Sequence, residues 1–464
     1  MPTIEFQECI AISGGTKELL SGNGVYQKVP ELLKNHFNSN QVFLIADTNT
    51  MNAAGNKLEE ILLSQKIKIK GKYVFAGEPR LHADYCHVET LVSTLNEKCA
   101  DSSQQLIPVS IGSGTINDLV KQAASETKLP YVCIPTAASV DGYTSFGSAI
   151  LKDGFKQTLP CEAPLAIAAD TNIMADAPVW LTSSGFGDLA GKIIAGADWI
   201  ISDHVSAFGA KGADSINPKA WAMVQHGLCY YLDRSLNAVY GDQDSLEALF
   251  EALSITGFAM QYTRSSRPVS GAEHLFAHIW EMENLSMNGN PVTHGHKVAI
   301  GTLVCTDFLE TLFADPNSPP SKAAGKAAGN FASFRRPSFD QRINEIKLAF
   351  DKSPALESVI ITAAEKFPDE KTLKTITEGV HDTWKTLREK VLEQIIPYNE
   401  LKAKLEKAQC PVTSKQINLS RAEVINCARR AQMIRNRYSE LDLAWDLGCM
   451  ETILAKMEKR TDRL

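Results

Sequence analysis

The chain has 464 residues, of which 44% are hydrophobic and 22% are charged, and its formal net charge is −7. A chain of this length exceeds one ordinary hydrophobic core, so two or three domains are expected. The acidic balance argues against a nucleic-acid partner, and no apolar stretch is long enough to cross a bilayer. The ten cysteines form no Cys-x-x-Cys pair, which is typical of free thiols in the reducing cytoplasm.

The predicted elements fall into two regions. The first 180 residues alternate strand-like and helix-like stretches, which is typical of a parallel sheet with crossover helices. The apolar runs that predict strands lie at residues 41–47, 72–75, 106–112, 131–135 and 163–170. The clearest later helices are predicted at residues 188–202, 221–232, 245–262, 382–395 and 421–437. We therefore expect a Rossmann-like α/β domain at residues 1–180 and an all-α domain at residues 181–464. Residues 315–338, rich in Pro, Ala, Gly and Ser, indicate an exposed loop.

A glycine-rich segment, Gly112-Ser113-Gly114-Thr115, follows the predicted strand at 106–112 and opens a helix. Glycines allow a pyrophosphate to approach the backbone, and a helix start offers it free N–H groups. The spacing differs from the Gly-x-Gly-x-x-Gly dinucleotide motif. A plain strand-to-helix turn explains the segment equally well, with Thr115 and Asp118 as a capping box.

Two further segments are candidates for coenzyme contacts. Asp47 ends the strand at 41–47, where an acid can accept hydrogen bonds from an adenosine ribose. Its charge would disfavour a 2′-phosphate, which favours NAD over NADP, and an exposed turn acid is the alternative. Residues 135–142 form a small-residue loop after another strand, where ligands approach such sheets. Thr136, Ser139 and Asp141 are its polar candidates, and a tight turn is the alternative.

Three separated residues predict a metal site. Asp188, His274 and His294 stand in the motifs Ser-Gly-Phe-Gly-Asp, Ser-Gly-Ala-Glu-His and Thr-His-Gly-His-Lys. One carboxylate and two imidazoles suit a divalent cation such as zinc and leave coordination positions open for a substrate. A closed structural site would need a fourth protein ligand. An open site polarises a bound hydroxyl or carbonyl, so the set predicts an enzyme.

The ordered set of motifs resembles the iron-containing alcohol dehydrogenase and glycerol dehydrogenase superfamily. It runs from Gly-Ser-Gly-Thr-x-x-Asp through Pro-Thr-Ala-Ala-Ser-x-Asp-Gly and Ala-Asp-Thr to the three metal motifs. Within the superfamily, residues 184–192, 267–274 and 434–448 are most similar to bacterial-type sn-glycerol-1-phosphate dehydrogenases. The resemblance covers nearly the whole chain except residues 315–338.

This resemblance implies a dehydroquinate synthase-like architecture and a homodimer. It also implies NAD(P)-linked hydride transfer between dihydroxyacetone phosphate and sn-glycerol 1-phosphate. The implied metal ligands are Asp188, His274 and His294, which would hold zinc or nickel, with iron as an alternative. The segment 112–115 would take the pyrophosphate, Asp47 the ribose, and Asp141 would lie near the nicotinamide and substrate. The family usually has Gly-Gly-Gly-Ser at 112–115, so Ser113 adds a side chain at a close-approach position.

Three neighbours of the metal motifs are substrate candidates. His278 lies one helical turn after His274 and either faces the substrate or is a core histidine. Lys192 either faces the substrate or pairs with Asp188 on the helix surface. Arg267 suits bidentate contact with a phosphate, with Lys192 as the second phosphate candidate. The alternative role of Arg267 is to position the Arg-Pro turn.

Other functions compete with this interpretation. A glycerol or other polyol dehydrogenase of the same superfamily is the main rival. A sugar-phosphate cyclase like dehydroquinate synthase normally has Glu in place of Asp188 and an Asn-x-Gly-His-x-x-Gly-His signature, which this sequence lacks. A non-catalytic relative that kept the fold is disfavoured by intact candidates at all three metal positions.

Overall fold

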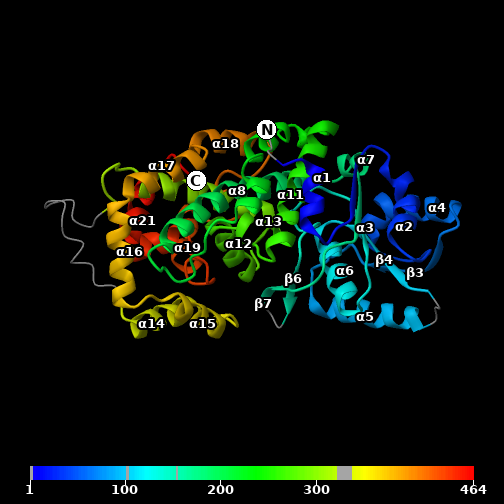
Figure 1. Cartoon of the computed structure of the whole chain (residues 1–464), viewed down its shortest axis with the longest axis horizontal. Helices are drawn as coiled ribbons and strands as arrows, with labels where there is room; N and C mark the ends of the chain where they lie inside the picture. The colour runs from blue at the N-terminus through cyan, green and yellow to red at the C-terminus, as the bar shows by residue number, and fades with distance from the viewer. Residues whose placement is uncertain (1–3, 101–103, 153–154, 321–336) are drawn as a thin grey trace. The chain divides into compact units, whose positions relative to one another are not determined.

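The computed structural model describes residues 4–100, 104–152, 155–320 and 337–464. The chain forms two compact units (Figure 1). The first comprises Met1–Leu189, Ala222–Ser266 and Lys407–Gln409, and the second comprises Ala190–Trp221, Arg267–Glu406 and Cys410–Leu464. The predicted fold class, a parallel-sheet region followed by a helical region, is confirmed. The division of the chain differs from the two domains expected on either side of residue 180, because residues 222–266 pack with the sheet-containing unit.

A six-stranded parallel sheet forms the first unit, in the strand order β1-β8-β5-β4-β2-β3. The strands are β1 (Glu18–Gly22), β2 (Gln41–Asp47), β3 (Lys68–Phe75), β4 (Leu106–Gly112), β5 (Val132–Pro135) and β8 (Ala166–Asp170). All five predicted strands are present, and β1 is an additional one. Its sequence, Glu-Leu-Leu-Ser-Gly, shows no apolar run, and it becomes a strand by pairing with β8.

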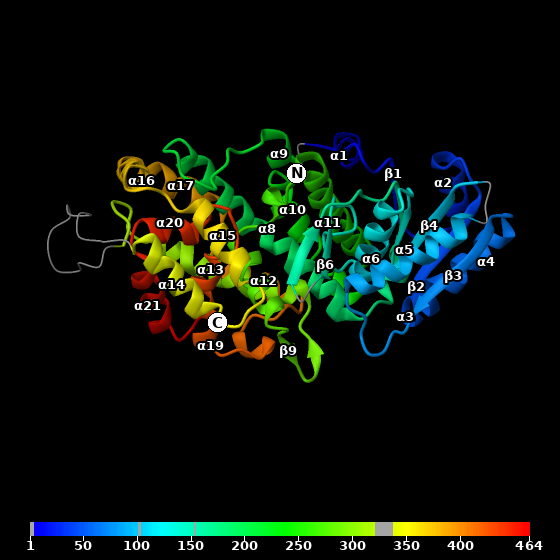
Figure 2. The ribbon, with the colours of Figure 1, turned by 90° about the horizontal axis from the view of Figure 1, so that it is seen from below.

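Helices cover both faces of this sheet (Figure 2). The helices α2 (Val29–His36) and α4 (Asn56–Ser64) share one hydrophobic core with alternate residues of β2, β4, β5 and β8. The helix α6 (Gly114–Glu126) lies against β4 and beside α5 (Tyr85–Ala100). Strands buried on both faces read as continuous apolar runs, which explains why β2 and β4 were predicted with their observed bounds.

Smaller elements complete the first unit. The strands β6 (Ser148–Lys152) and β7 (Phe155–Leu159) form an antiparallel hairpin that the sequence did not predict. The helix α11 (Gln243–Thr263) is longer by a few residues than predicted, and the predicted helix at 221–232 is two short helices. The remaining elements here are α1 (Phe6–Ser13), η1 (Val25–Lys28), α3 (Thr48–Thr50), η2 (Met51–Gly55), α7 (Thr171–Ala175), α10 (Leu228–Arg234) and η3 (Ala238–Tyr240). The helix α9 (Pro218–Val224) has residues in both units.

Within its described residues, the second unit is helical apart from a short hairpin. The long helix α8 (Val179–Ser206) contributes residues to both units, and α12 (Ala272–Met282) packs along α13 (His294–Leu312). Most of α13 is buried, including polar residues such as Thr302 and Asp307. The other elements are η4 (Arg267–Val269), β9 (Ser286–Met287), β10 (Asn290–Pro291), α14 (Phe339–Ala349), α15 (Leu356–Lys366), α16 (Glu370–Asp382), α17 (Trp384–Gln394), α18 (Tyr398–Lys407), η6 (Ser414–Ile417), α19 (Arg421–Ala431), α20 (Glu440–Asp446) and α21 (Met450–Lys459).

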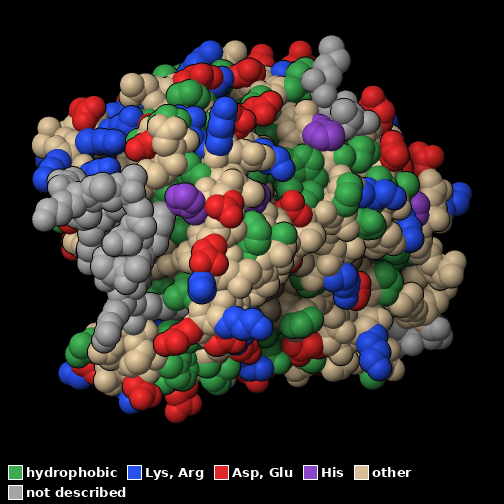
Figure 3. Space-filling model, turned by 60° about the vertical axis from the view of Figure 1, so that its left-hand side comes forward, with side chains coloured by type: hydrophobic (Ala, Val, Ile, Leu, Met, Phe, Trp, Pro, Cys, Tyr) green, Lys and Arg blue, Asp and Glu red, His purple; other side chains and the backbone are tan. Residues whose placement is uncertain are grey.

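The surface agrees with the small net charge. Acidic and basic side chains are interspersed over much of the face that Figure 3 shows. Among the described residues, no helix combines the length and apolar character that a membrane span requires. Of the predicted exposed loop at 315–338, residues 321–336 lie outside the described part, and residues 315–320 belong to no helix or strand.

Candidate metal and coenzyme site

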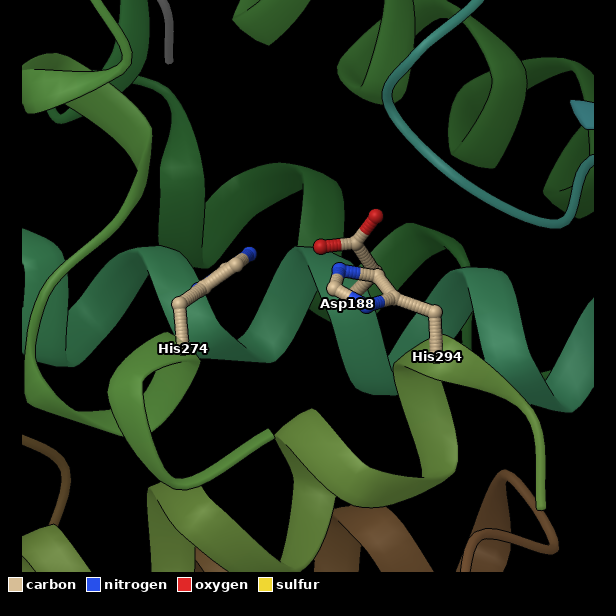
Figure 4. Close-up of side chains that lie close together, drawn as sticks. All are labelled: Asp188, His274 and His294. Carbon is tan, nitrogen blue, oxygen red and sulfur yellow. The ribbon is translucent and has the colours of Figure 1, made fainter. Parts of the chain in front are cut away.

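The structure brings Asp188, His274 and His294 together (Figure 4). They come from α8, α12 and α13, and one potential ligand atom of each lies within 4.8 Å of the others. Asp188 and His274 are buried and His294 is partly buried. The separation and the donor set fit a single divalent cation with positions left for other ligands.

Local sequence features place the two histidines. The Thr293 side chain accepts a hydrogen bond from the His296 backbone N–H, so α13 begins at His294. Gly191 of α8 lies against α12 and α13, and a Cβ there would stand 2.6 Å from Val298 Cγ1 and 3.6 Å from His274 Cε1. Glycine at 191 therefore permits the close approach that brings His274 to α8.

The start of α12 is fixed by a buried carboxylate. Asp198 Oδ2 accepts a hydrogen bond from the Ala272 backbone N–H at 2.6 Å, and Asp198 Oδ1 accepts one from the Glu440 backbone N–H at 2.6 Å. Burial raises the pKa of Asp198 to about 7, although the charge of Arg267 opposes that shift. Asp198 thereby fixes the first turn of the helix that carries His274.

Each metal-site histidine also has a carboxylate at its Nδ1 atom. Glu273 Oε1 lies 2.6 Å from His274 Nδ1, and Glu281 Oε1 lies 2.8 Å from His294 Nδ1. The sequence interpretation missed both acids. Glu273 could have been found because it directly precedes His274 in its motif. Glu281 gives no such signal, since it is one of several acids on helices.

The loop that follows β5 joins this cluster through a backbone contact. The Asp141 backbone N–H donates to Asp188 Oδ2 at 2.9 Å. The loop is anchored by the buried Lys121, whose Nζ donates to Gly142 O at 2.7 Å, Ser145 Oγ at 3.1 Å and Gly147 O at 3.1 Å. The sequence analysis did not single out Lys121 on α6, because a lone lysine in a helical pattern gives no sign of burial.

The glycine-rich segment is the turn between β4 and α6. The helix begins at Gly114 with Ser113 as its N-cap, and no side-chain cap bond forms there. The predicted capping box of Thr115 and Asp118 is therefore wrong, because both residues lie inside the helix. Asp118 Oδ1 instead lies 3.7 Å from Lys121 Nζ. A helix start without a side-chain cap retains backbone N–H groups that suit an anion.

Steric contacts and hydrogen bonds hold together the two segments predicted to contact the coenzyme, residues 112–115 and 135–142. A Cβ at Gly114 would stand 2.9 Å from Val140 Cγ2, so a larger residue there would displace the 135–142 loop. The Thr136 backbone N–H donates to Gly112 O at 3.2 Å. Ser139 Oγ lies 3.0 Å from the Tyr143 hydroxyl, which in turn donates to Ala137 O at 2.6 Å. Contacts of Thr136 and Ser139 with a coenzyme stay predictions.

Asp47 lies at the carboxyl end of β2, half-exposed, as the ribose interpretation requires. Its Oδ1 accepts a hydrogen bond from the Thr50 backbone N–H at 2.8 Å, and its own N–H donates to Thr50 Oγ1 at 3.0 Å. This reciprocal capping box fixes the carboxylate at the start of α3. Asp47 thus has a structural role that is compatible with ribose contact.

We expect Asp47→Asn to shift coenzyme preference toward NADPH by about tenfold in kcat/KM, because the carboxylate no longer repels a 2′-phosphate. Asparagine caps helices as well as aspartate does, so the thermal midpoint should hardly change. Steady-state rates with NADH and NADPH give the ratio. An unchanged ratio in a folded variant would remove Asp47 from the coenzyme site.

Of the other substrate candidates, Lys192 is buried and His278 is partly buried beside the two histidines of the cluster. Lys192 is fully buried, so the alternative of an ion pair on the helix surface is wrong. His278 Nδ1 lies 3.3 Å from Glu281 Oε2, and burial lowers the pKa of His278, which keeps its imidazole neutral. His278 is not part of the group that could hold a metal. Substrate contact by either side chain stays a prediction.

The structure gives Arg267 a set of contacts within the protein. Its Nη2 donates to Asp198 O at 2.9 Å and to Tyr438 O at 3.0 Å, and its Nε lies 3.1 Å from Asp214 Oδ1. The side chain is almost completely buried, and burial lowers its pKa. These contacts favour the interpretation in which Arg267 positions the Arg-Pro turn before α12.

Comparisons with known proteins agree with this arrangement. The family model for iron-containing alcohol dehydrogenases matches residues 20–178. A glycerol-1-phosphate dehydrogenase [NAD(P)+] of Bacillus velezensis is 35% identical over 59% of this chain and 66% of its own length. The Bacillus licheniformis enzyme of the same name is 32% identical over 64% of this chain and 71% of its own length.

Solved structures share the fold. A glycerol dehydrogenase from Schizosaccharomyces pombe superposes with a TM-score of 0.57 at 18% identity, covering 96% of this chain and 91% of its own. A 1,3-propanediol oxidoreductase superposes with a TM-score of 0.56 at 14% identity, covering 95% and 98%. The sheet and the helical region therefore have the fold of these polyol dehydrogenases. Within that class, the chain belongs to the glycerol-1-phosphate dehydrogenase family of NAD(P)-linked oxidoreductases.

Proposed function

We propose that this chain interconverts dihydroxyacetone phosphate and sn-glycerol 1-phosphate by hydride transfer at C2, with NAD(P) and one divalent cation. The observation that carries the proposal is the cluster of Asp188, His274 and His294. Relatives that carry the name glycerol-1-phosphate dehydrogenase [NAD(P)+] support the substrate class. The contact of Asp141 with Asp188 adds support, since it joins the loop after β5 to a metal ligand.

The side chains would divide the work as follows. Asp188, His274 and His294 would hold the cation, which when bound supplies Lewis-acid polarisation of the substrate oxygen at C2. The uncapped start of α6 would bind the pyrophosphate, and Asp47 the ribose. Asp141 would lie beside the nicotinamide and the substrate, at a position fixed by its N–H bond to Asp188.

The phosphate group of the substrate requires a positively charged side chain in the site. Lys192 is one candidate, because it lies one helical turn from Asp188 on α8. Arg267 is the other, and its Nη2 atom donates to the carbonyls of Asp198 and Tyr438. A buried ammonium near a doubly charged phosphate would be strongly favourable in this setting.

The proposal is tested by assaying the purified protein with zinc or nickel and NADH. Dihydroxyacetone phosphate should drive NADH oxidation, whereas dihydroxyacetone should give a kcat/KM lower by about 10³-fold, since the phosphate contact is lost. Activity with dihydroxyacetone or glycerol alone would assign the chain to the polyol dehydrogenases. Turnover of a sugar phosphate with no net change in NADH would assign it to the cyclases.

We also propose the identity of the metal, the preferred coenzyme, the oligomeric state and the cellular location. Zinc or nickel suits one carboxylate and two imidazoles better than magnesium does. NAD is favoured over NADP by the charge of Asp47. A homodimer and a cytoplasmic location follow from the family resemblance and from the scattered cysteines. Metal analysis, coenzyme kinetics, sedimentation and fractionation test these four properties in turn.

A further inference from the structure

Two buried carboxylates contact the outer nitrogens of the metal-site histidines. Glu273 is 0% exposed and Glu281 is 6% exposed, and each lies within hydrogen-bond distance of the Nδ1 atom of one histidine. Carboxylates ordinarily avoid such burial unless they are paired. The two histidines have equivalent contacts, because a carboxylate oxygen lies at the Nδ1 atom of both His274 and His294.

We propose that Glu273 and Glu281 are positioning residues that fix both imidazoles in the tautomer with the proton on Nδ1. Glu273 Oε1 already accepts a hydrogen bond from the Gly271 backbone N–H, and a carboxylate oxygen that faces a ring nitrogen accepts in the same way, so each facing Nδ1 atom is the donor. A neutral imidazole that donates from Nδ1 carries its lone pair on Nε2. Both histidines therefore present Nε2 to the cation, with orientations fixed before it binds. This inference rests on the proposed metal-dependent function.

Glu273 is itself held in place. Its Oε1 also accepts a hydrogen bond from the Gly271 backbone N–H at 2.8 Å. Its backbone packs closely against α13, because a Cβ at Gly301 would stand 2.5 Å from Glu273 O. The carboxylate and the ring of His274 thus form one rigid group at the first turn of α12. Rigid placement of a ligand reduces the conformational entropy that metal binding would cost.

Glu281 serves two histidines from the end of α12. Its Oε1 faces His294 Nδ1 at 2.8 Å, and its Oε2 faces His278 Nδ1 at 3.3 Å. Lys297 Nζ stands 3.8 Å from the same carboxylate and balances its charge. This sharing explains how His294 joins the metal cluster whereas His278, which is not in it, is still fixed nearby.

Substitutions of Glu281 separate hydrogen-bond geometry from charge. Glu281→Gln removes the charge but keeps an acceptor at the same reach, whereas Glu281→Asp keeps the charge but shortens the reach by one methylene. Glu283 is the matched control, because it lies two residues away and pairs with Arg430 at the surface. Glu283→Gln and Glu283→Asp should leave the metal site unchanged.

The measurements are zinc affinity by chelator competition and the visible absorption spectrum of the cobalt(II)-loaded protein. We expect Glu281→Asp to weaken zinc binding by about 10- to 100-fold and to alter the cobalt spectrum. Glu281→Gln should weaken binding by less than about tenfold and keep the wild-type spectrum, since the acceptor remains. Thermal unfolding confirms that the variants are folded.

The outcomes separate this inference from the proposed function. If the wild-type protein binds no zinc, the proposed function fails. If it binds zinc and both Glu281 variants match it, the positioning role is overturned. Loss of affinity in Glu281→Gln with retention in Glu281→Asp would also overturn it, because the carboxylate would then act through charge alone.

Discussion

Replacing Asp188 by asparagine is expected to abolish stoichiometric zinc binding and to lower kcat/KM by at least about 10³-fold, which corresponds to about 4 kcal/mol of transition-state stabilisation. Asp188 is the anionic member of the cluster, and an amide oxygen is a much weaker zinc ligand. The side-chain oxygen of asparagine can still accept the hydrogen bond from the Asp141 N–H, so the fold should persist. Metal content and steady-state rates measure the effect.

A matched control keeps this result specific. Asp176→Asn removes an equal charge from an exposed position just beyond α7 and should leave zinc content and rate unchanged. Wild-type zinc stoichiometry and activity in Asp188→Asn would contradict the metal assignment. A folded variant that binds zinc but has no activity would place Asp188 in the chemistry without a ligand role.

The second large effect concerns stability. Arg267→Met should lower the free energy of unfolding of the second unit by about 3–5 kcal/mol, because it leaves buried partners of a charged group unsatisfied. Those buried partners are the backbone oxygens of Asp198 and Tyr438, and the exposed carboxylate of Asp214 also loses its ion pair. The KM for dihydroxyacetone phosphate should change little in the fraction that folds. Chemical denaturation and substrate titration measure the two quantities.

Arg264 provides the comparison for that experiment. It lies three residues before Arg267 and pairs with Glu162 at the surface, where both side chains are more than half exposed. Arg264→Met should therefore change stability by less than about 0.5–1 kcal/mol. If Arg267→Met kept normal stability but raised the KM more than tenfold, Arg267 would contact the substrate phosphate after all.

The fold was predictable where a single element carries its own pattern. The central strands β2 and β4 are buried on both sides, so their apolar runs mark them directly. The strand β1 depends on its pairing with β8, and the hairpin of β6 and β7 has no strong apolar alternation, so neither was found. The helix predicted at 421–437 ends at Ala431 in the structure. Its end was predicted too late because charge periodicity alone does not mark the C-terminus of a helix.

The sequence predicted the candidate metal ligands better than the side chains that hold them in place. Motif order singled out Asp188, His274 and His294, but only the tertiary structure could place them together. Lys121 and Glu281 were missed because a buried charge on an amphipathic helix reads in sequence like a solvated one. The burial of Arg267 could not be predicted either, because partners such as the Tyr438 carbonyl come from distant segments of the chain.

The most direct test of the metal assignment is a crystal structure of the zinc-loaded protein with anomalous data collected at the zinc edge. We predict one anomalous peak about 2.0–2.2 Å from an Asp188 carboxylate oxygen and from Nε2 of both His274 and His294. A peak bound elsewhere, or no peak among these three side chains in a protein that has taken up zinc, would contradict the account.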